Sequence, residues 1–119
     1  DFKREFSIVL IQRALHYVPY EKQVELLRVL PSFMNKSGYL YLAVSCVDSD
    51  MGIDYEGLDL EIPERFHYLS KEMQERFSLK APVCLHSLSE FKTLMDTTVF
   101  KERDIYQTSF GNIKGLYQL

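Results

Sequence analysis

The sequence lacks a glycine-rich nucleotide-binding loop, and its only cysteines are Cys46 and Cys84. Two cysteines are too few for a disulfide framework or a structural zinc site, so we expect free thiols in a reducing compartment. Long apolar runs are also missing, since no stretch approaches the roughly 20 residues that span a bilayer. No secretion signal is recognisable in residues 1–5, which are mostly charged. These absences predict a cytoplasmic protein without a membrane partner.

Positive charge is scarce as well. The 119 residues include 14 Lys and Arg against 17 Asp and Glu, which gives a net charge of −3. Nucleic-acid-binding domains usually carry a basic stripe, so we expect no nucleic-acid partner. A chain of this length with 46% hydrophobic residues suits a single domain with one core. Because the sequence does not begin with Met, we expect residues 1–119 to be a fragment of a longer protein.

Two apolar runs, residues 6–12 and 39–46, predict β-strands that lie side by side and run parallel. The first run shows no alternation of apolar and polar residues, so we expect both of its faces to be covered. Between the runs, residues 21–34 have the spacing of an amphipathic helix. Pro31 predicts a kink in that helix, and Gly38 predicts its left-handed cap. Such a βαβ unit places ligand chemistry at the carboxyl ends of its strands.

The next segment is strongly acidic. Residues 48–64 hold seven Asp and Glu and no Lys or Arg, which predicts a solvated loop. The spacing of the carboxylates suggests a calcium loop, but Ile53 stands where the sharp turn needs glycine. Asp59 also stands where such a loop has a bidentate glutamate. We therefore predict no metal site.

The last part of the chain predicts two further helices and a hairpin. Pro63 suits the first turn of a helix over about residues 63–77, and a capping box at Ser87 and Glu90 predicts a helix over about 88–96. Alternating residues on both sides of a two-residue Gly-Asn turn predict an antiparallel hairpin in the tail. The predicted class is α/β: a partial Rossmann-like three-layer sandwich of two parallel strands, a C-terminal antiparallel hairpin and three helices.

Three phrases, in this order, resemble the C-terminal half of a class I S-adenosylmethionine-dependent methyltransferase. Residues 6–19 resemble the fourth strand of that family and the turn after it. Residues 26–42 resemble its next helix, its glycine turn and its fifth strand. Residues 87–100 resemble its last helix and the start of its sixth strand. The resemblance implies that residues 1–119 form one half of a larger domain, with a lid-like insertion at about residues 48–80.

The resemblance also implies an activity. The longer protein would transfer a methyl group from S-adenosylmethionine to a small-molecule acceptor, and this chain would supply the acceptor side and the lid. The family's glycine-rich loop and the acidic residue that holds the ribose would lie before Asp1. We therefore expect the chain alone to bind S-adenosylmethionine weakly or not at all and to be inactive.

Candidate site residues follow the two parallel strands. The resemblance places Gln12 and Arg13, at the end of the first strand, near the cofactor. It makes His16 and Tyr17 in the next turn, and Ser45 at the end of the second strand, candidates for substrate binding. In the alternative interpretation Tyr17 packs the next helix onto the sheet, Arg13 is solvated and His16 is structural. The catalytic residues stay unidentified.

A second function belongs to a different class. A half-domain exposes the edge of its first strand, and such an edge invites pairing with another strand. The alternative to an enzyme part is therefore a non-catalytic α/β interaction module, with a homodimer formed through the exposed sheet edge.

Overall fold

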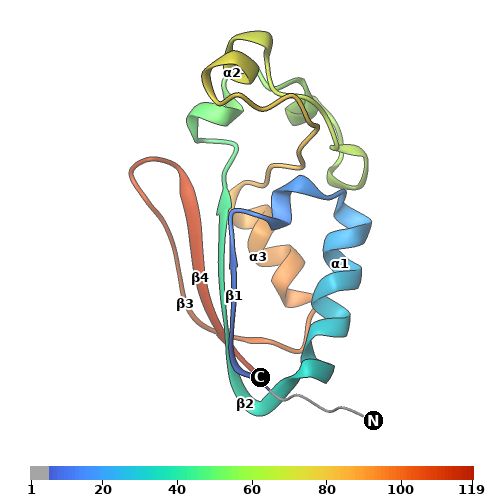
Figure 1. Ribbon diagram of the computed structural model, residues 1–119, viewed down its shortest axis with the longest axis vertical. Helices are drawn as coiled ribbons and strands as arrows, with labels where there is room; N and C mark the ends of the chain where they lie inside the picture. Colours follow the sequence, from blue (N-terminus) through green and yellow to red (C-terminus); the bar gives the residue numbers. More distant parts are fainter. Residues whose placement is uncertain (1–5) are drawn as a thin grey trace.

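The computed structural model describes residues 6–119 as a mixed four-stranded sheet with α-helices and short 3₁₀ turns around it (Figure 1). The strands and α-helices have these bounds: β1 Phe6–Gln12, α1 Tyr20–Val29, β2 Met34–Ser45, α2 Lys71–Arg76, α3 Leu88–Asp96, β3 Lys101–Gln107 and β4 Asn112–Gln118. The strands follow the spatial order β1-β2-β4-β3. β1 and β2 run parallel, and β4 pairs antiparallel with both β2 and β3.

The predicted βαβ unit is confirmed. Ile8 lies opposite Tyr39 in the parallel register, and α1 lies in the connection between the two strands. The predicted helix also restarts at Pro31, because α1 ends at Val29 and a 3₁₀ turn covers Leu30–Phe33. Proline has no N–H to continue the helical ladder, which explains the break.

Two expectations about the start of β2 are wrong. β2 begins at Met34, and Gly38 lies inside the strand rather than at a helix cap. The peptide groups there are used by neighbouring chain segments, since Met34 pairs with Phe6 and the N–H of Leu119 donates to the Gly38 oxygen at 3.0 Å. A side chain at Gly38 would lie 3.2 Å from the Phe6 carbonyl oxygen, so the close strand contact explains the glycine.

One face of the sheet forms the core. Figure 1 shows α1 and α3 on the same side of the sheet, and their apolar stripes pack against it. The larger residues of this core are Leu27, Leu40, Leu42, Phe91, Leu94, Ile113 and Tyr117. The last strand contributes Ile113 and Tyr117 to this core, and both are buried.

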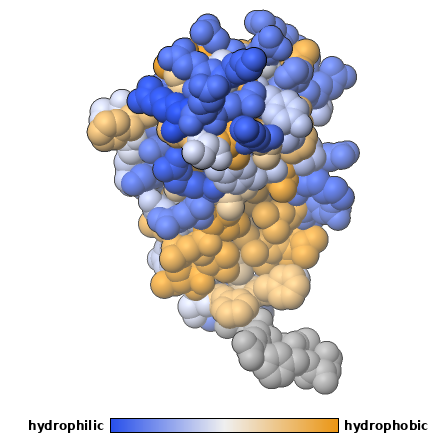
Figure 2. All heavy atoms as spheres, turned by 45° about the horizontal axis from the view of Figure 1, so that its top comes forward, coloured by the Kyte–Doolittle hydropathy of each residue, from blue (hydrophilic) through white to orange (hydrophobic). Residues whose placement is uncertain are grey.

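The other face of the sheet is open, and this corrects the expectation that both faces of residues 6–12 are covered. Ile8 is 64% exposed and Leu10 is 65% exposed. β1 is an edge strand, and within residues 6–119 no helix packs on its outer face. Figure 2 shows apolar side chains gathered in the half of the molecule that holds the sheet. The α/β class is confirmed, and the chain forms two of the three layers of the sandwich.

Residues 48–80 form a separate unit above the carboxyl ends of β1 and β2 (Figure 1). Its acidic part consists of short 3₁₀ turns at Asp50–Gly52, Glu56–Asp59 and Ile62–Glu64. A second small core, separate from that of the sheet, holds this segment together with the strand-like residues after it. Its buried residues are Met51, Tyr55, Leu69, Met73, Val83 and Leu85.

The predicted helix over residues 63–77 is wrong in its first half, because only α2 is helical. Residues 65–69 instead make tertiary bonds: His67 and Val83 exchange two backbone hydrogen bonds of 3.0 and 2.8 Å. The guanidinium of buried Arg65 donates to the carbonyl oxygens of Gly57, Leu60 and Leu85 and pairs with Glu90 at 2.7 Å. A buried guanidinium needs these partners, and they hold the segment in an extended form.

The helix at α3 and the hairpin after it follow the prediction more closely. The Ser87–Glu90 capping box is present in both directions. The hairpin turn is longer than expected, since it runs from Thr108 to Gly111 and Asn112 already pairs with Ser45. Gly111 has φ of 81° and approaches Ser49 so closely that a side chain there would clash with its backbone. Within residues 6–119, none of the helices has the length and apolar character needed to cross a membrane.

Candidate functional site

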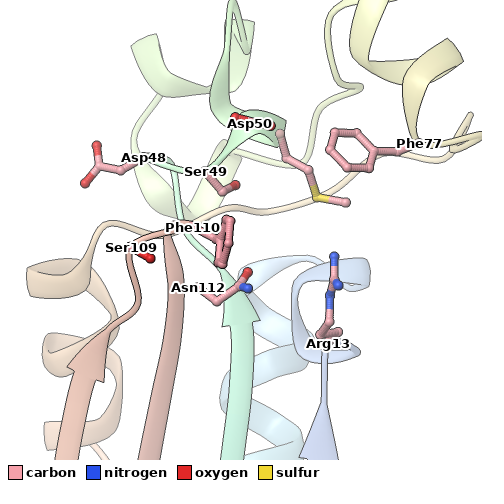
Figure 3. Close-up of a pocket in the computed structure, with 9 residues that line it drawn as sticks. Arg13, Asp48, Ser49, Asp50, Phe77, Ser109, Phe110 and Asn112 are labelled. Atoms are coloured by element: carbon pink, nitrogen blue, oxygen red, sulfur yellow. The ribbon is translucent and has the colours of Figure 1, made fainter.

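A pocket of about 380 Å³ lies where β1 and β2 end, between the 48–80 segment and the turn of the β3–β4 hairpin (Figure 3). We call it the strand-end pocket. It is lined by Arg13, Asp48, Ser49, Asp50, Met51, Phe77, Ser109, Phe110 and Asn112. The close approach of Gly111 to Ser49 brings the hairpin turn to this position. The carboxyl ends of parallel strands are where open α/β sheets bind ligands.

Arg13 is the positively charged residue of the pocket. Its N–H donates to the Ala43 oxygen at 2.6 Å, so it continues the β1–β2 ladder by one bond. Its backbone then turns sharply, with φ of 52°, into the short 3₁₀ turn at Leu15–Tyr17. Figure 3 shows the Arg13 side chain rising from the end of β1 toward the 48–80 segment.

Two carboxylates border the same pocket, and both have partners. Asp50 forms an ion pair of 2.8 Å with Arg76. Asp48 accepts a hydrogen bond of 3.4 Å from the side-chain amide of Gln107. The pocket therefore joins one cation, two carboxylates and the rings of Phe77 and Phe110.

Of the two residues predicted near the cofactor, Arg13 lines the strand-end pocket and Gln12 does not. Gln12 is exposed at the last position of β1, opposite Ala43. Both residues lie at the predicted edge of the sheet. Their contact with a cofactor stays a prediction.

The three predicted substrate-binding residues lie close to one another at the ends of β1 and β2. His16 and Ser45 are buried, and Nδ1 of His16 accepts the N–H of Ser45 at 3.2 Å. Tyr17 is half-exposed, and its ring centroid lies 4.4 Å from that of His16. The structure thus brings His16, Tyr17 and Ser45 together, but none of the three lines the strand-end pocket.

His16 belongs to a buried pair of imidazoles. Burial, followed by the charge of Arg13, lowers the pKa of His16 to about 4. Burial also lowers the pKa of His86 to about 4, and its Nε2 lies 2.7 Å from the Gln23 side-chain oxygen. Both rings are therefore neutral at pH 7. His16 Nε2 and His86 Nδ1 have no hydrogen-bond partner among the residues that the structure describes.

The chain offers no thiolate nucleophile and no metal cluster in its described part. Burial raises the pKa of the Cys46 thiol, and burial raises that of Cys84 to about 11, so both are protonated at pH 7. Among residues 6–119, no three His, Cys, Asp or Glu side chains are grouped as metal ligands.

Sequence reasoning missed most of the strand-end pocket. Phe77, Ser109, Phe110 and Asn112 come from segments far from β1 in the chain, and no local motif joins them. The one signal was Gly111, a glycine at a hairpin turn. Its positive φ brings Phe110 and Asn112 to the pocket rim.

No protein family model matches the sequence, and no curated protein matches it either. Solved structures do match the fold. An O-methyltransferase family 2 protein from Planctomyces limnophilus, solved with apigenin, has a TM-score of 0.61 and 17% identity, over 95% of this chain and 30% of that one. A methyltransferase from Thermotoga maritima, described as S-adenosylmethionine-dependent and a possible histamine N-methyltransferase, has a TM-score of 0.65 and 13% identity, over 99% and 59%.

A third match is NcsB1, an O-methyltransferase from neocarzinostatin biosynthesis. It was solved with S-adenosyl-L-homocysteine and 1,4-dihydroxy-2-naphthoic acid, and it has a TM-score of 0.59 and 14% identity, over 99% of this chain and 31% of that one. The chain therefore has the fold of part of a class I S-adenosylmethionine-dependent methyltransferase. It spans about a third of the length of the two O-methyltransferases and 59% of the T. maritima protein.

The described residues do not by themselves enclose a nucleoside cofactor. The α-helices begin after Pro19, Ser70 and Ser87, and none follows a glycine-rich turn that could hold a phosphate or carboxylate on its amides. Gln12 and Arg13 lie at the carboxyl end of β1.

Proposed function

We propose that the chain is part of an S-adenosylmethionine-dependent methyltransferase and supplies the acceptor side of its active site. The observation that carries the proposal is the strand-end pocket, formed at the carboxyl ends of β1 and β2 in a fold shared with methyltransferases. Methyl transfer depends chiefly on holding donor and acceptor in line, so a shaped pocket serves it without a strong base.

The 48–80 segment has the position of a lid in this proposal. It lies above the strand ends and contributes Asp48, Ser49, Asp50, Met51 and Phe77 to the pocket. Arg65 ties it to α3 through Glu90. Neighbours with this fold were solved with apigenin and 1,4-dihydroxy-2-naphthoic acid, which supports a small-molecule acceptor.

S-Adenosylmethionine is the cofactor of the proposed reaction, and neighbours solved with S-adenosylhomocysteine support this assignment. Gln12 and Arg13 are proposed to face it. The rest of its site lies outside this chain, so the 119 residues alone should bind it weakly or not at all.

A second function is favoured by the bare edge of β1 and by the open sheet face around Ile8 and Leu10. In that case the chain is a non-catalytic interaction module that pairs with a second copy through β1. A homodimer would cover this surface without any cofactor.

Isothermal calorimetry with S-adenosylhomocysteine tests the two functions, on the 119-residue chain and on the longest protein that contains it. Binding by the longer protein alone supports the methyltransferase. Absence of binding by both, together with a dimer of the short chain in sedimentation, overturns it in favour of the interaction module.

A further inference from the structure

The backbone of Arg13 is held in an unusual conformation at the strand-end pocket. Its φ of 52° lies in the left-handed region, which arginine rarely occupies. The bond from its N–H to the Ala43 oxygen fixes the residue at this position. Outliers of this kind gather at functional sites, where the surrounding structure holds a side chain in a required direction. Here that direction is toward Phe77 (Figure 3).

The charge of Arg13 is available to a ligand. Among residues 6–119, no carboxylate forms an ion pair with Arg13. The nearby acids are already engaged, because Asp50 pairs with Arg76 and Asp48 accepts from Gln107. Figure 3 shows the Asp48 carboxylate on the far side of the pocket, directed away from Arg13. A negative group on a ligand therefore has one favourable place in this pocket.

Two aromatic rings complete the pocket wall. Phe110 at the hairpin turn is 83% exposed, which is unusual for so large an apolar side chain, and Phe77 follows α2. Both line the same space as Arg13. Rings of this kind contact the face or edge of a planar ligand, and a guanidinium binds a carboxylate in a two-pronged arrangement.

We infer that the strand-end pocket binds a small aromatic acid, with Arg13 pairing with its carboxylate and Phe77 and Phe110 contacting its ring. Arg13 is thus the residue that selects acidic ligands over neutral ones. The binding of the acid does not depend on the proposed function. Its role as the methyl acceptor does.

The test compares 6-hydroxy-2-naphthoate with its neutral amide, 6-hydroxy-2-naphthamide, by calorimetry on the longest protein that contains the chain. We expect the acid to bind about tenfold more tightly than the amide, because a charge-assisted pair is worth more than a neutral hydrogen bond. Arg13→Gln should remove this preference, because it lowers the affinity for the acid about tenfold and leaves the affinity for the amide unchanged. Arg13→Lys should keep part of it, because the charge stays and the fork geometry is lost.

Arg103→Gln is the matched control. Arg103 is an exposed arginine of β3 that bonds to Gln118, outside the strand-end pocket, so its loss should leave the ratio of the two affinities unchanged. Circular dichroism and thermal melting establish that each variant is folded. Equal affinity for acid and amide in the unaltered protein overturns the inference, and so does an unchanged ratio in Arg13→Gln.

S-Adenosylhomocysteine also carries a carboxylate, on its amino-acid end. A second set of measurements therefore tests which of the two carboxylates Arg13 binds, that of the cofactor or that of the aromatic acid. The affinity of Arg13→Gln for S-adenosylhomocysteine is measured beside its affinity for the naphthoate, and we expect the larger loss, about tenfold, for the naphthoate. If Arg13→Gln weakens the binding of S-adenosylhomocysteine but not that of the naphthoate, Arg13 binds the cofactor, and the proposed acid site is wrong. If the protein prefers the naphthoate to its amide but does not bind S-adenosylhomocysteine, the acid site is supported and the proposed methyltransferase function is contradicted.

Discussion

Individual residues with left-handed backbone angles direct the chain at three places in the described part: Arg13, Asp54 and Ser78. Ser78 follows α2 at the position where helices favour glycine. The N–H of Leu79 donates to the Gln74 oxygen and that of Ser78 to the Glu75 oxygen, which is the Schellman pattern that ends a helix. The side chain of Ser78 is therefore tolerated there at a cost.

Ser78→Gly should stabilise the protein. Glycine adopts the φ of 50° found at this position without the Cβ clash, which is worth about 1 kcal/mol in the free energy of unfolding. Urea denaturation followed by circular dichroism measures the change. The matched control is Ser89→Gly in the first turn of α3, which should destabilise by about 0.5 kcal/mol. Destabilisation by Ser78→Gly would mean that the cap at the end of α2 differs from the one described.

Among the secondary-structure elements, β1 has the least complete environment. Its inward residues Val9 and Ile11 pack on the core, whereas Ile8 and Leu10 point to the open face. Strands of parallel sheets are normally covered on both faces. The continuous apolar run of β1 is explained if another part of a larger domain covers this face.

A double variant, Ile8→Thr with Leu10→Thr, tests whether the chain is half of a larger domain or a module that folds by itself. In the 119-residue chain both side chains are mostly exposed, so the free energy of unfolding should change by less than about 1 kcal/mol. In the longer protein a covered face should make the same change cost about 3 kcal/mol or more. Thermal and urea unfolding of both proteins give the two values.

Leu58→Thr is the control for this comparison. Leu58 is half-exposed in the 48–80 segment, away from the sheet. Its substitution should lower the free energy of unfolding by the same small amount in both proteins. If the double variant lowers the free energy of unfolding by an equally small amount in both proteins, the chain is not half of a larger domain, and the interaction module is favoured.

For the molecule as a whole, the two buried imidazoles contribute to the pH dependence of stability. His16 and His86 have pKa values lowered to about 4 in the fold, mainly by burial, while histidines of the unfolded chain titrate near 6.5. Between these values the unfolded chain binds more protons than the native one, so stability falls as the pH falls. The neighbouring titratable and charged groups are Arg13 and His86 for His16, and Glu90 and Arg65 for His86.

The free energy of unfolding should therefore decrease from pH 6.5 down to about pH 4, by up to about 3 kcal/mol for each histidine. His16→Asn should remove about half of this dependence, because asparagine can still accept the N–H of Ser45 without taking up a proton. Urea titrations at a series of pH values measure the slope. A stability that is flat from pH 6.5 to 4 in the unaltered protein would contradict the burial of neutral imidazoles.

The sequence by itself determined the elements whose signals are local. The apolar runs at β1 and β2, the break at Pro31, the capping box at Ser87 and the alternation around Ile113 each depend on neighbouring residues alone. Their order was enough to indicate the parallel pair, the hairpin and the α/β class. The position of Arg13 at the end of a strand followed from the same reasoning.

Only the tertiary structure decided what depends on distant contacts. Arg65 opposes a helix over residues 63–77 by binding the carbonyl groups of Gly57, Leu60 and Leu85, which belong to two other segments. The extension of β2 to Met34 depends on pairing with Phe6, and the strand-end pocket depends on the approach of Gly111 to Ser49. These interactions join residues far apart in the chain, so hydrogen bonds and burial across the fold outweigh the local preferences that a sequence displays.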